Sequence, residues 1–538
     1  MVSVTTTSSV TTTSPGMIRV VNWKQVVVIA AGVPALVLFS MGGISATVGT
    51  PAWLIWTISV LFGFFQSFTY AEIAGLHPSK TGGTAVHGAT AWIRYSRILA
   101  PLSLWSNWTA WSPVLAIGAG LGAGYLLSIF FDANSPIMTW QLTLVDLDFI
   151  SKDLTMRINA TFLLGAAIMI SVFAIQHRGI LRTAQLSAIL TIASLVPLFI
   201  VCVIPLLQGS VHADNFLPFT PLLTDNGKII PGAWDKAGWV LVLGGLFIAA
   251  WSTYGFETAV CYMSEFKNPG RDGVKAIVVS GLICIVAYVT VPVVFQGVLG
   301  TQKMLDPGIA DGSGMGLALA SMLNAGPLIT KILVLLLFFS LIMSIVTAMA
   351  GSSRTLNQGG QDGWLPKYLG YVNSHGAPTR AMWTDLCFNL ILLSMSNYLF
   401  VLAVSNVNYL IFNFLNLNAG WIHRIDNPDV PRPWRCPNWL LATGAVLSYV
   451  NAFIMGAGAN VWGAGTLLSG FACAALAIPV FAFRHYIVDK GVYPAHMYQD
   501  LLLEGETELA PTRAGILPYV AIAGGIGSCL LGYFIFWT

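Results

Sequence analysis

Long runs of apolar residues, separated by short polar stretches, recur along the whole chain. An α-helix needs about 20 apolar residues to cross a hydrocarbon core of ~30 Å. Lipid cannot hydrogen-bond to the peptide backbone, so helix is the expected form of each run. The pattern predicts an all-α membrane protein of about thirteen transmembrane helices, near residues 25–49, 52–75, 98–131, 158–176, 184–207, 237–263, 275–299, 328–350, 381–397, 399–423, 438–458, 464–485 and 516–537.

Glycine-containing interruptions divide two of these runs. The first is broken at Ser40–Ser45 and the sixth at Trp251–Phe256, so each break falls in the first helix of a block of five. Breaks at corresponding places in two halves indicate an inverted repeat, and an odd number of spans per block requires the inversion. The expected units are a disordered cytoplasmic tail (1–22), a first repeat (23–210), a second repeat (236–424), two further helices (437–486), a cytoplasmic loop (487–514) and an extra C-terminal helix (515–538).

Composition supports a membrane location and excludes several other classes. Only 9% of the 538 residues are charged, whereas a soluble domain carries about 25%. Basic residues are not concentrated in any patch, so a nucleic-acid partner is not expected. The seven cysteines form no CxxC pair, and no metal site or disulfide framework is indicated. No catalytic or cofactor motif is present, so neither an enzyme nor a cofactor is expected.

Lys and Arg are distributed unevenly between alternate loops. If the N-terminus is cytoplasmic, 19 of the 25 lie in inside loops. The positive-inside rule therefore predicts this orientation, and the cell membrane is the expected location. The six that remain for the outside loops are Lys152, Arg157, Lys228, Lys236, Lys303 and Lys331.

The two broken helices are the candidate binding site. A break leaves free N–H groups for a carboxylate and free C=O groups for a cation or an ammonium group. Aromatic faces at the second break suit an apolar or cationic side chain. The alternative is that the glycines serve only close helix packing. The candidate substrate-binding residues are Ser40, Met41, Gly42, Gly43, Ile44, Ser45, Trp251, Ser252, Thr253, Tyr254, Gly255 and, from a tryptophan stripe on the third span, Trp111.

Glu257 is the candidate gating or coupling residue, because a carboxylate inside a long apolar run is costly. The alternative is a structural carboxylate that holds the break open. Ser340, Ser344 and Thr347 place hydroxyls at helical spacing, where they would coordinate a coupling ion or bond back to their own helix. Asp385, near the start of its span, is expected at the membrane interface.

Several separated motifs resemble the amino acid–polyamine–organocation superfamily of secondary transporters, over roughly residues 25–485. They are Tyr70-Ala71-Glu72 followed by Pro78 and Gly82-Gly83; Trp251 to Glu257 followed by Asn268-Pro269 and Arg271; and Ser352-Ser353-Arg354 followed by Asp362-Gly363-Trp364-Leu365-Pro366 and Gly376-Ala377-Pro378. The resemblance implies a five-plus-five (LeuT-like) core, alternating access, and substrate held between broken helices 1 and 6. It also implies that Glu257 occupies a position linked to gating or coupling.

This chain departs from the family pattern in three places. It has Gly42-Gly43-Ile44 where the family has Gly-x-Gly, its fifth span contains no lysine, and thirteen spans replace twelve. The expected function is ion-coupled or exchange transport of an amino acid, preferably a small or apolar zwitterion. H⁺ and Na⁺ both stay open as coupling ions. The alternatives are a related amine (γ-aminobutyrate, a choline-like compound or a polyamine) and, from another class, a sensor that binds solute without transport. The expected partners are a small molecule and the bilayer; the oligomeric state is left open.

Overall fold

The computed structural model describes residues 21–30, 33–77, 80, 82–132, 134–178, 199, 203–225, 228–500 and 512–538. Most of the predicted tail (1–22), most of the fifth span (184–207) and part of the loop 487–514 lie outside these residues. The structure therefore does not describe the surroundings of the fifth span, in which the sequence has no lysine.

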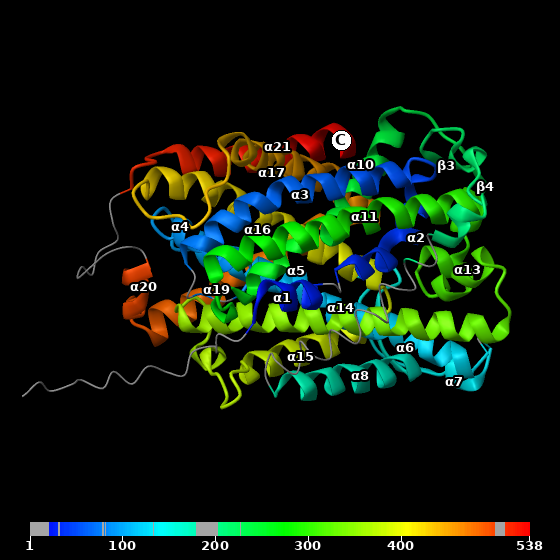
Figure 1. Ribbon diagram of the computed structural model, residues 1–538, viewed down its shortest axis with the longest axis horizontal. Coiled ribbons are helices and arrows are strands. Elements are labelled where there is room, and N and C mark those ends of the chain that lie inside the picture. Colours follow the sequence, from blue (N-terminus) through cyan, green and yellow to red (C-terminus); the bar gives the residue numbers. More distant parts are fainter. Residues whose placement is uncertain are drawn as a thin grey trace, which may run out of the picture.

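Long helices that run side by side make up the molecule (Figure 1). Nine stretches within the described residues are long and apolar enough to cross a membrane. They are α3 (Ala52–Leu76), α5 with α6 (Leu99–Trp111, Pro113–Phe130), α10 with the 3₁₀ helix η3 (Lys236–Thr253, Gly255–Glu265), α11 (Pro269–Met304), α14 (Pro327–Gln361), α16 (Tyr398–Asp426), α17 with η5 (Asn438–Gly458, Ala459–Trp462), α18 with α19 and the π-helix η6 (Thr466–Ala475, Ala477–Ala482, Phe483–Val488), and α21 (Leu517–Trp537).

Four shorter helices account for three more of the predicted spans. The first span consists of α1 (Trp23–Ala30) and α2 (Val37–Val48), the fourth is α8 (Ala160–Gln176), and the ninth is α15 (Thr379–Leu393). A turn separates α15 from α16, as predicted, and the Asn397 side chain accepts a hydrogen bond from Phe400 N there (3.1 Å). Because α8 and α15 have only 17 and 15 residues, the count of thirteen full-length spans is not reproduced in the described part of the chain.

The expectation of purely α-helical structure needs a correction, because two β-hairpins lie in the loops. Strands β1 (Gln141–Asp146) and β2 (Thr155–Asn159) pair antiparallel, as do β3 (Leu222–Asp225) and β4 (Lys228–Pro231). Apolar periodicity does not reveal such strands, since β1 is exposed along its whole length. The remaining short elements are α4 (Thr84–Trp92), α7 (Pro136–Thr139), α12 (Pro307–Ala310), α13 (Met315–Met322), α20 (Ala495–Asp500), η1 (Pro34–Leu36), η2 (Ala213–Phe216) and η4 (Lys367–Gly370).

The two ends of the helix bundle differ in character. The hairpins and α13 lie at one end, which we call the hairpin end, and α4 and α20 lie at the other, the α4 end (Figure 1). Buried ion pairs gather at the α4 end: Glu72 pairs with Arg424 and Arg432, Lys80 with Asp362, and Glu265 with Arg354. Most of these charged groups come from the predicted inside loops.

Candidate functional site

The interruption in the first span lies earlier than the sequence predicts. Ser40 to Ser45 are inside the regular helix α2, whereas the non-helical part runs from Val33 through the 3₁₀ turn Pro34–Leu36. The predicted break position is therefore wrong. Pro34 has no N–H to donate, and a proline is best accommodated just before or at the first turn of a helix, so it ends one segment and precedes the next.

The glycines of α2 lie at close packing contacts, and their role in substrate binding stays a prediction. A Cβ atom on Gly42 would overlap the carbonyl oxygen of Ile309 in α12, and one on Gly43 would lie 3.3 Å from the ring of Trp462. This is the packing alternative. Met41, Ile44 and Ser45 are buried around them. The Ser40 hydroxyl is buried and has no hydrogen-bond partner among the described residues.

The predicted interruption of the sixth span is confirmed. Helix α10 ends at Thr253, and the tighter 3₁₀ helix η3 begins at Gly255. The Ser252 and Thr253 hydroxyls donate to the carbonyl oxygen of Ala249 in their own helix, at 3.2 and 2.9 Å. Trp251 donates from Nε1 to Ala110 O (3.1 Å), which fixes its ring beside the third span.

The two interruptions meet in the middle of the bundle. A Cβ atom on Gly255 would lie 2.7 Å from Val33 Cγ1 and 3.0 Å from the Trp111 ring. Tyr288 of α11 donates its hydroxyl between Val33 O (2.6 Å) and Ser252 O (3.0 Å), joining the two broken segments. Glycine is required here by the close approach of neighbouring side chains.

Glu257 lies one turn beyond this meeting point and is 2% exposed. Its Oε1 accepts from Trp111 Nε1 and from Tyr409 Oη, each at 3.0 Å, and its Oε2 accepts from Thr84 Oγ1 at 3.0 Å. No Lys, Arg or His of the described residues forms an ion pair with it. Glu257 therefore ties η3 to α4, α5 and α16 through neutral donors only, an arrangement that accommodates a bound proton or an incoming cationic group.

Three of these contacts were not found from the sequence. Thr84, Tyr288 and Tyr409 come from elements far from the breaks, and nothing in their local sequence distinguishes them from ordinary buried polar residues. Tyr254 begins a second buried chain, because its hydroxyl donates to Asn451 Oδ1 (2.9 Å) and Asn451 Nδ2 donates to Asn413 Oδ1 (3.0 Å). Such contacts depend on how α16 and α17 pack against the break.

The hydroxyls of α14 bond back along their own helix. Ser340, Ser344 and Thr347 each donate to the carbonyl oxygen four residues earlier, at 3.4, 3.2 and 3.0 Å. This is the alternative weighed for them, and their role in binding a coupling ion stays a prediction. No group of three or more His, Cys, Asp or Glu side chains arranged for a metal ion occurs in the described part of the chain.

Asp385, expected at the membrane interface, is enclosed by protein. Its side chain is completely buried between α5, α14 and α15. It accepts hydrogen bonds from Trp108 Nε1 (2.9 Å), Ser112 Oγ (2.5 Å) and the Ser352 hydroxyl. Its sequence position near the start of a span does not reveal this enclosure, which makes the carboxylate a second buried acidic group with neutral donors.

Comparison with known proteins identifies the family. The sequence model of the amino acid permease family matches residues 21–479. This chain belongs to the amino acid permease family. Both broken helices, Glu257 and the buried ion pairs lie inside the matched range, whereas α21 lies beyond it.

Individual permeases are only distantly similar. The chain is 22% identical to the branched-chain amino acid permease BcaP of Lactococcus lactis over 251 aligned residues. These residues make up 46% of this chain and 50% of that protein. It is 23% identical over 279 residues to the mouse solute carrier family 7 member 12 (52% and 56%). It is 22% identical over 403 residues to a putative arginine/ornithine antiporter of Escherichia coli (70% and 76%). The chain thus spans about half the length of the first two relatives that it matches.

Proposed function

We propose that this permease is a secondary active transporter of an amino acid, with a small or apolar zwitterion as the preferred substrate. The proposal rests on one observation above the others: the two interrupted helices meet at Val33 and Gly255, with the buried carboxylate of Glu257 beside them. Backbone groups at such interruptions suit the carboxylate and the ammonium group of an amino acid. A five-plus-five repeat and alternating access complete the proposed mechanism.

The aromatic and aliphatic groups at the meeting point favour an apolar side chain. Val33, Trp111 and Trp251 lie there, and Glu257 is the acidic residue hydrogen-bonded at the break. A doubly cationic substrate would need a further carboxylate facing the same space, which ranks polyamines below zwitterions. A branched-chain permease and an arginine/ornithine antiporter both occur among the relatives, so the assay must include both substrate types.

In the proposed cycle the ion pairs of the α4 end form the closed gate on that side. Glu72 of α3 accepts from Arg424 of α16 (2.6 Å), and Lys80 lies 2.9 Å from Asp362, so each pair joins the first proposed repeat to the second. Opening this side requires both pairs to separate. Neutralising Glu257 by a proton or by the substrate ammonium group would change its hold on Thr84 and Tyr409, which belong to the same two repeats.

Uptake of labelled amino acids into proteoliposomes, with proton and sodium gradients imposed separately, tests the proposal. Accumulation of one substrate under one gradient is expected. Counterflow of labelled against unlabelled solute separates a carrier from a sensor, because a sensor binds solute without exchanging it across the membrane. Failure of every amino acid together with exchange of γ-aminobutyrate or choline would transfer the proposal to the related-amine alternative.

Glu257→Gln is expected to reduce gradient-driven uptake about tenfold or more while changing substrate affinity less. The amide cannot be charged, and its NH₂ group would face one of the three donors that now reach the carboxylate. Uptake and equilibrium binding are measured on the same preparation. Thr84→Ser, which keeps the hydroxyl, is the control. Wild-type uptake by Glu257→Gln at every pH would remove Glu257 from the mechanism.

A further inference from the structure

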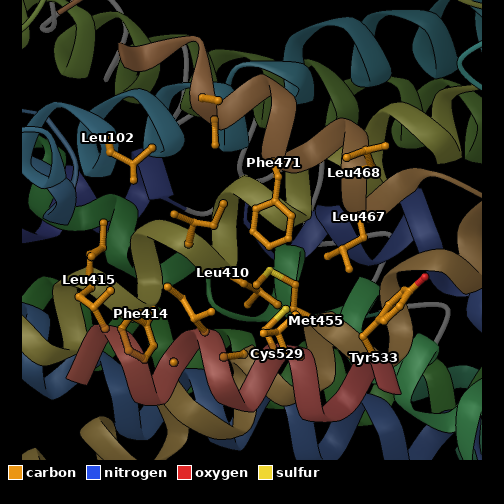
Figure 2. A pocket seen from close by; sticks show the side chains of 18 of the residues that line it. Leu102, Leu410, Phe414, Leu415, Met455, Leu467, Leu468, Phe471, Cys529 and Tyr533 are labelled. Atoms are coloured by element: carbon orange, nitrogen blue, oxygen red, sulfur yellow. The ribbon is translucent and has the colours of Figure 1, made fainter. Parts of the chain in front are cut away.

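An apolar groove lies apart from the two breaks, between α21 and the helices α5, α16, α17 and α18 (Figure 2). Its volume is about 840 Å³, within the range of roughly 300–1,000 Å³ of ligand pockets. Side chains such as Leu102, Phe414, Met455 and Phe471 line it (Figure 2). A cavity of this size and lining takes a hydrocarbon chain in preference to a polar molecule.

The groove belongs to the part of the molecule that faces lipid. Helix α21 and the span that begins with α18 are apolar enough to cross the membrane. In the most apolar 18-residue segment of each, only 22% and 28% of the residues, respectively, are buried by protein. Leu468 and Leu530 line the groove and are 74% and 48% exposed. Water is excluded from this depth of a bilayer, so the molecules available to fill the groove are membrane components.

The groove extends along the bundle from one end toward the other. Its lining runs from Leu99, at the start of α5 and the α4 end, to Gly465, which lies beside Ile150 of the β1–β2 loop at the hairpin end. Leu102 and Leu415 lie at one end of the groove and Leu467 and Tyr533 at the other (Figure 2). An acyl chain that enters from one leaflet, about 15 Å or half of the ~30 Å hydrocarbon core, fills the part of the groove nearer the α4 end.

A positive charge lies at the α4 end of the groove. Leu99 and Leu102 of α5 line this end, and the exposed Arg97 lies two residues before Leu99. Arg97 forms no ion pair with any described residue. A guanidinium group at the membrane surface pairs well with a phosphate, and the α4 end is the predicted cytoplasmic side, where anionic lipids are enriched.

We propose that this groove binds one acyl chain of an anionic phospholipid, with the lipid phosphate beside Arg97. The chain would lie against Leu410 and Ile411 of α16. The residue before them, Tyr409, donates to Glu257. Lipid in the groove therefore supports the helix that holds the buried carboxylate. This consequence rests on the proposed transport function, whereas lipid binding itself does not.

Native mass spectrometry of the detergent-purified protein tests the proposal through retained lipid, with phosphatidylglycerol and phosphatidylcholine added in turn. Ala475 is exposed and lines the groove, so Ala475→Trp is expected to fill it and to lower phosphatidylglycerol affinity about tenfold, or about 1.4 kcal/mol. Ala472 is exposed on the same helix but does not line the groove, so Ala472→Trp is the matched control. Arg97→Gln is expected to abolish the preference for phosphatidylglycerol and to keep binding of phosphatidylcholine.

Each contrary result overturns the proposal. Equal phosphatidylglycerol binding by wild type, Ala475→Trp and Ala472→Trp would place the lipid elsewhere, and an unchanged preference in Arg97→Gln would remove the headgroup contact. A dimer that Ala475→Trp alone dissociates would assign the groove to a second copy. Thermal melting of every variant confirms that the protein is folded, and none of these readouts depends on the transported substrate.

Discussion

Single residues at the second break carry most of the site chemistry. The expense of a carboxylate in an apolar run singles out Glu257 from the sequence, and the structure supplies the three donors that make its burial possible. The sequence does not identify the donors, because Thr84 and Tyr409 reach Glu257 across helices whose relative placement is a tertiary property. Gly255 matters because it has no side chain: a Cβ atom at this position would collide with Val33 and the Trp111 ring.

Gly255→Leu is expected to lower substrate affinity more than about tenfold. The new side chain would occupy the space that Val33 and the Trp111 ring now approach. Equilibrium binding of the substrate found in the uptake assay is the measurement. Gly124→Leu is the control, because a Cβ atom there meets nothing within 4 Å. Unchanged affinity in Gly255→Leu would place the substrate away from the breaks.

Asp385→Asn is expected to destabilise the protein by about 1–3 kcal/mol. The amide offers one acceptor oxygen where the carboxylate offers two, so one of Trp108, Ser112 and Ser352 would lose its partner. Thermal melting in detergent detects the loss. Cys387→Ala, at an exposed position two residues further along α15, is the control. Equal melting of Asp385→Asn and wild type would show that these hydrogen bonds are not needed for stability.

At the scale of elements, small residues decide how closely helices approach. Helix α21, beyond the range matched by the permease family, lies along α17 (Figure 1). A Cβ atom on Gly456 would overlap Cys529 O, and one on Gly532 would overlap Phe453 O. Trp537 Nε1 donates to Ala457 O (2.8 Å) at the end of the contact. These close backbone contacts hold the extra helix in place.

Gly456→Leu is expected to separate α21 from α17 and to cost about 1–3 kcal/mol of stability, as overpacking of a close interface does. Thermal melting measures the change. Gly527→Leu is made on α21 itself, where a Cβ atom meets nothing within 4 Å, and is expected to melt like wild type. If both variants melt alike, the close contact at Gly456 does not hold the helix.

At the scale of the whole molecule, the two ends of the bundle differ, because the buried ion pairs gather at the α4 end. Burial alone raises the pKa of the Asp362 carboxyl, but the Lys80 charge and hydrogen bonds from His496 and Lys80 outweigh burial, so the net pKa lies below its ordinary value. A lowered folded-state pKa contributes stability above the unfolded-state pKa, about 3.9, and this contribution is lost as the pH falls. The Lys80–Asp362 ion pair therefore stabilises the folded protein at neutral pH.

Asp362→Asn is expected to lower the melting temperature clearly at pH 7, because breaking one side of a buried ion pair costs about 3–5 kcal/mol. The difference from wild type should stay constant down to about pH 5 and shrink below about pH 4, where wild type also becomes protonated. Melting curves across this range, with the exposed Asp429→Asn as control, provide the measurement. A difference independent of pH would assign the loss to packing rather than charge.

The sequence by itself determined the helical membrane class, the family resemblance and the break at Gly255, and it singled out Glu257 as a candidate. Each follows from local patterns: apolar length, glycine in a span, a carboxylate that lipid does not tolerate. Tertiary structure decided the position of the first break near Pro34, the burial of Asp385, the hairpins, and the partners of Glu257. The physical reason is that bilayer burial makes every span apolar on all sides, so periodicity no longer shows which face meets a neighbouring helix.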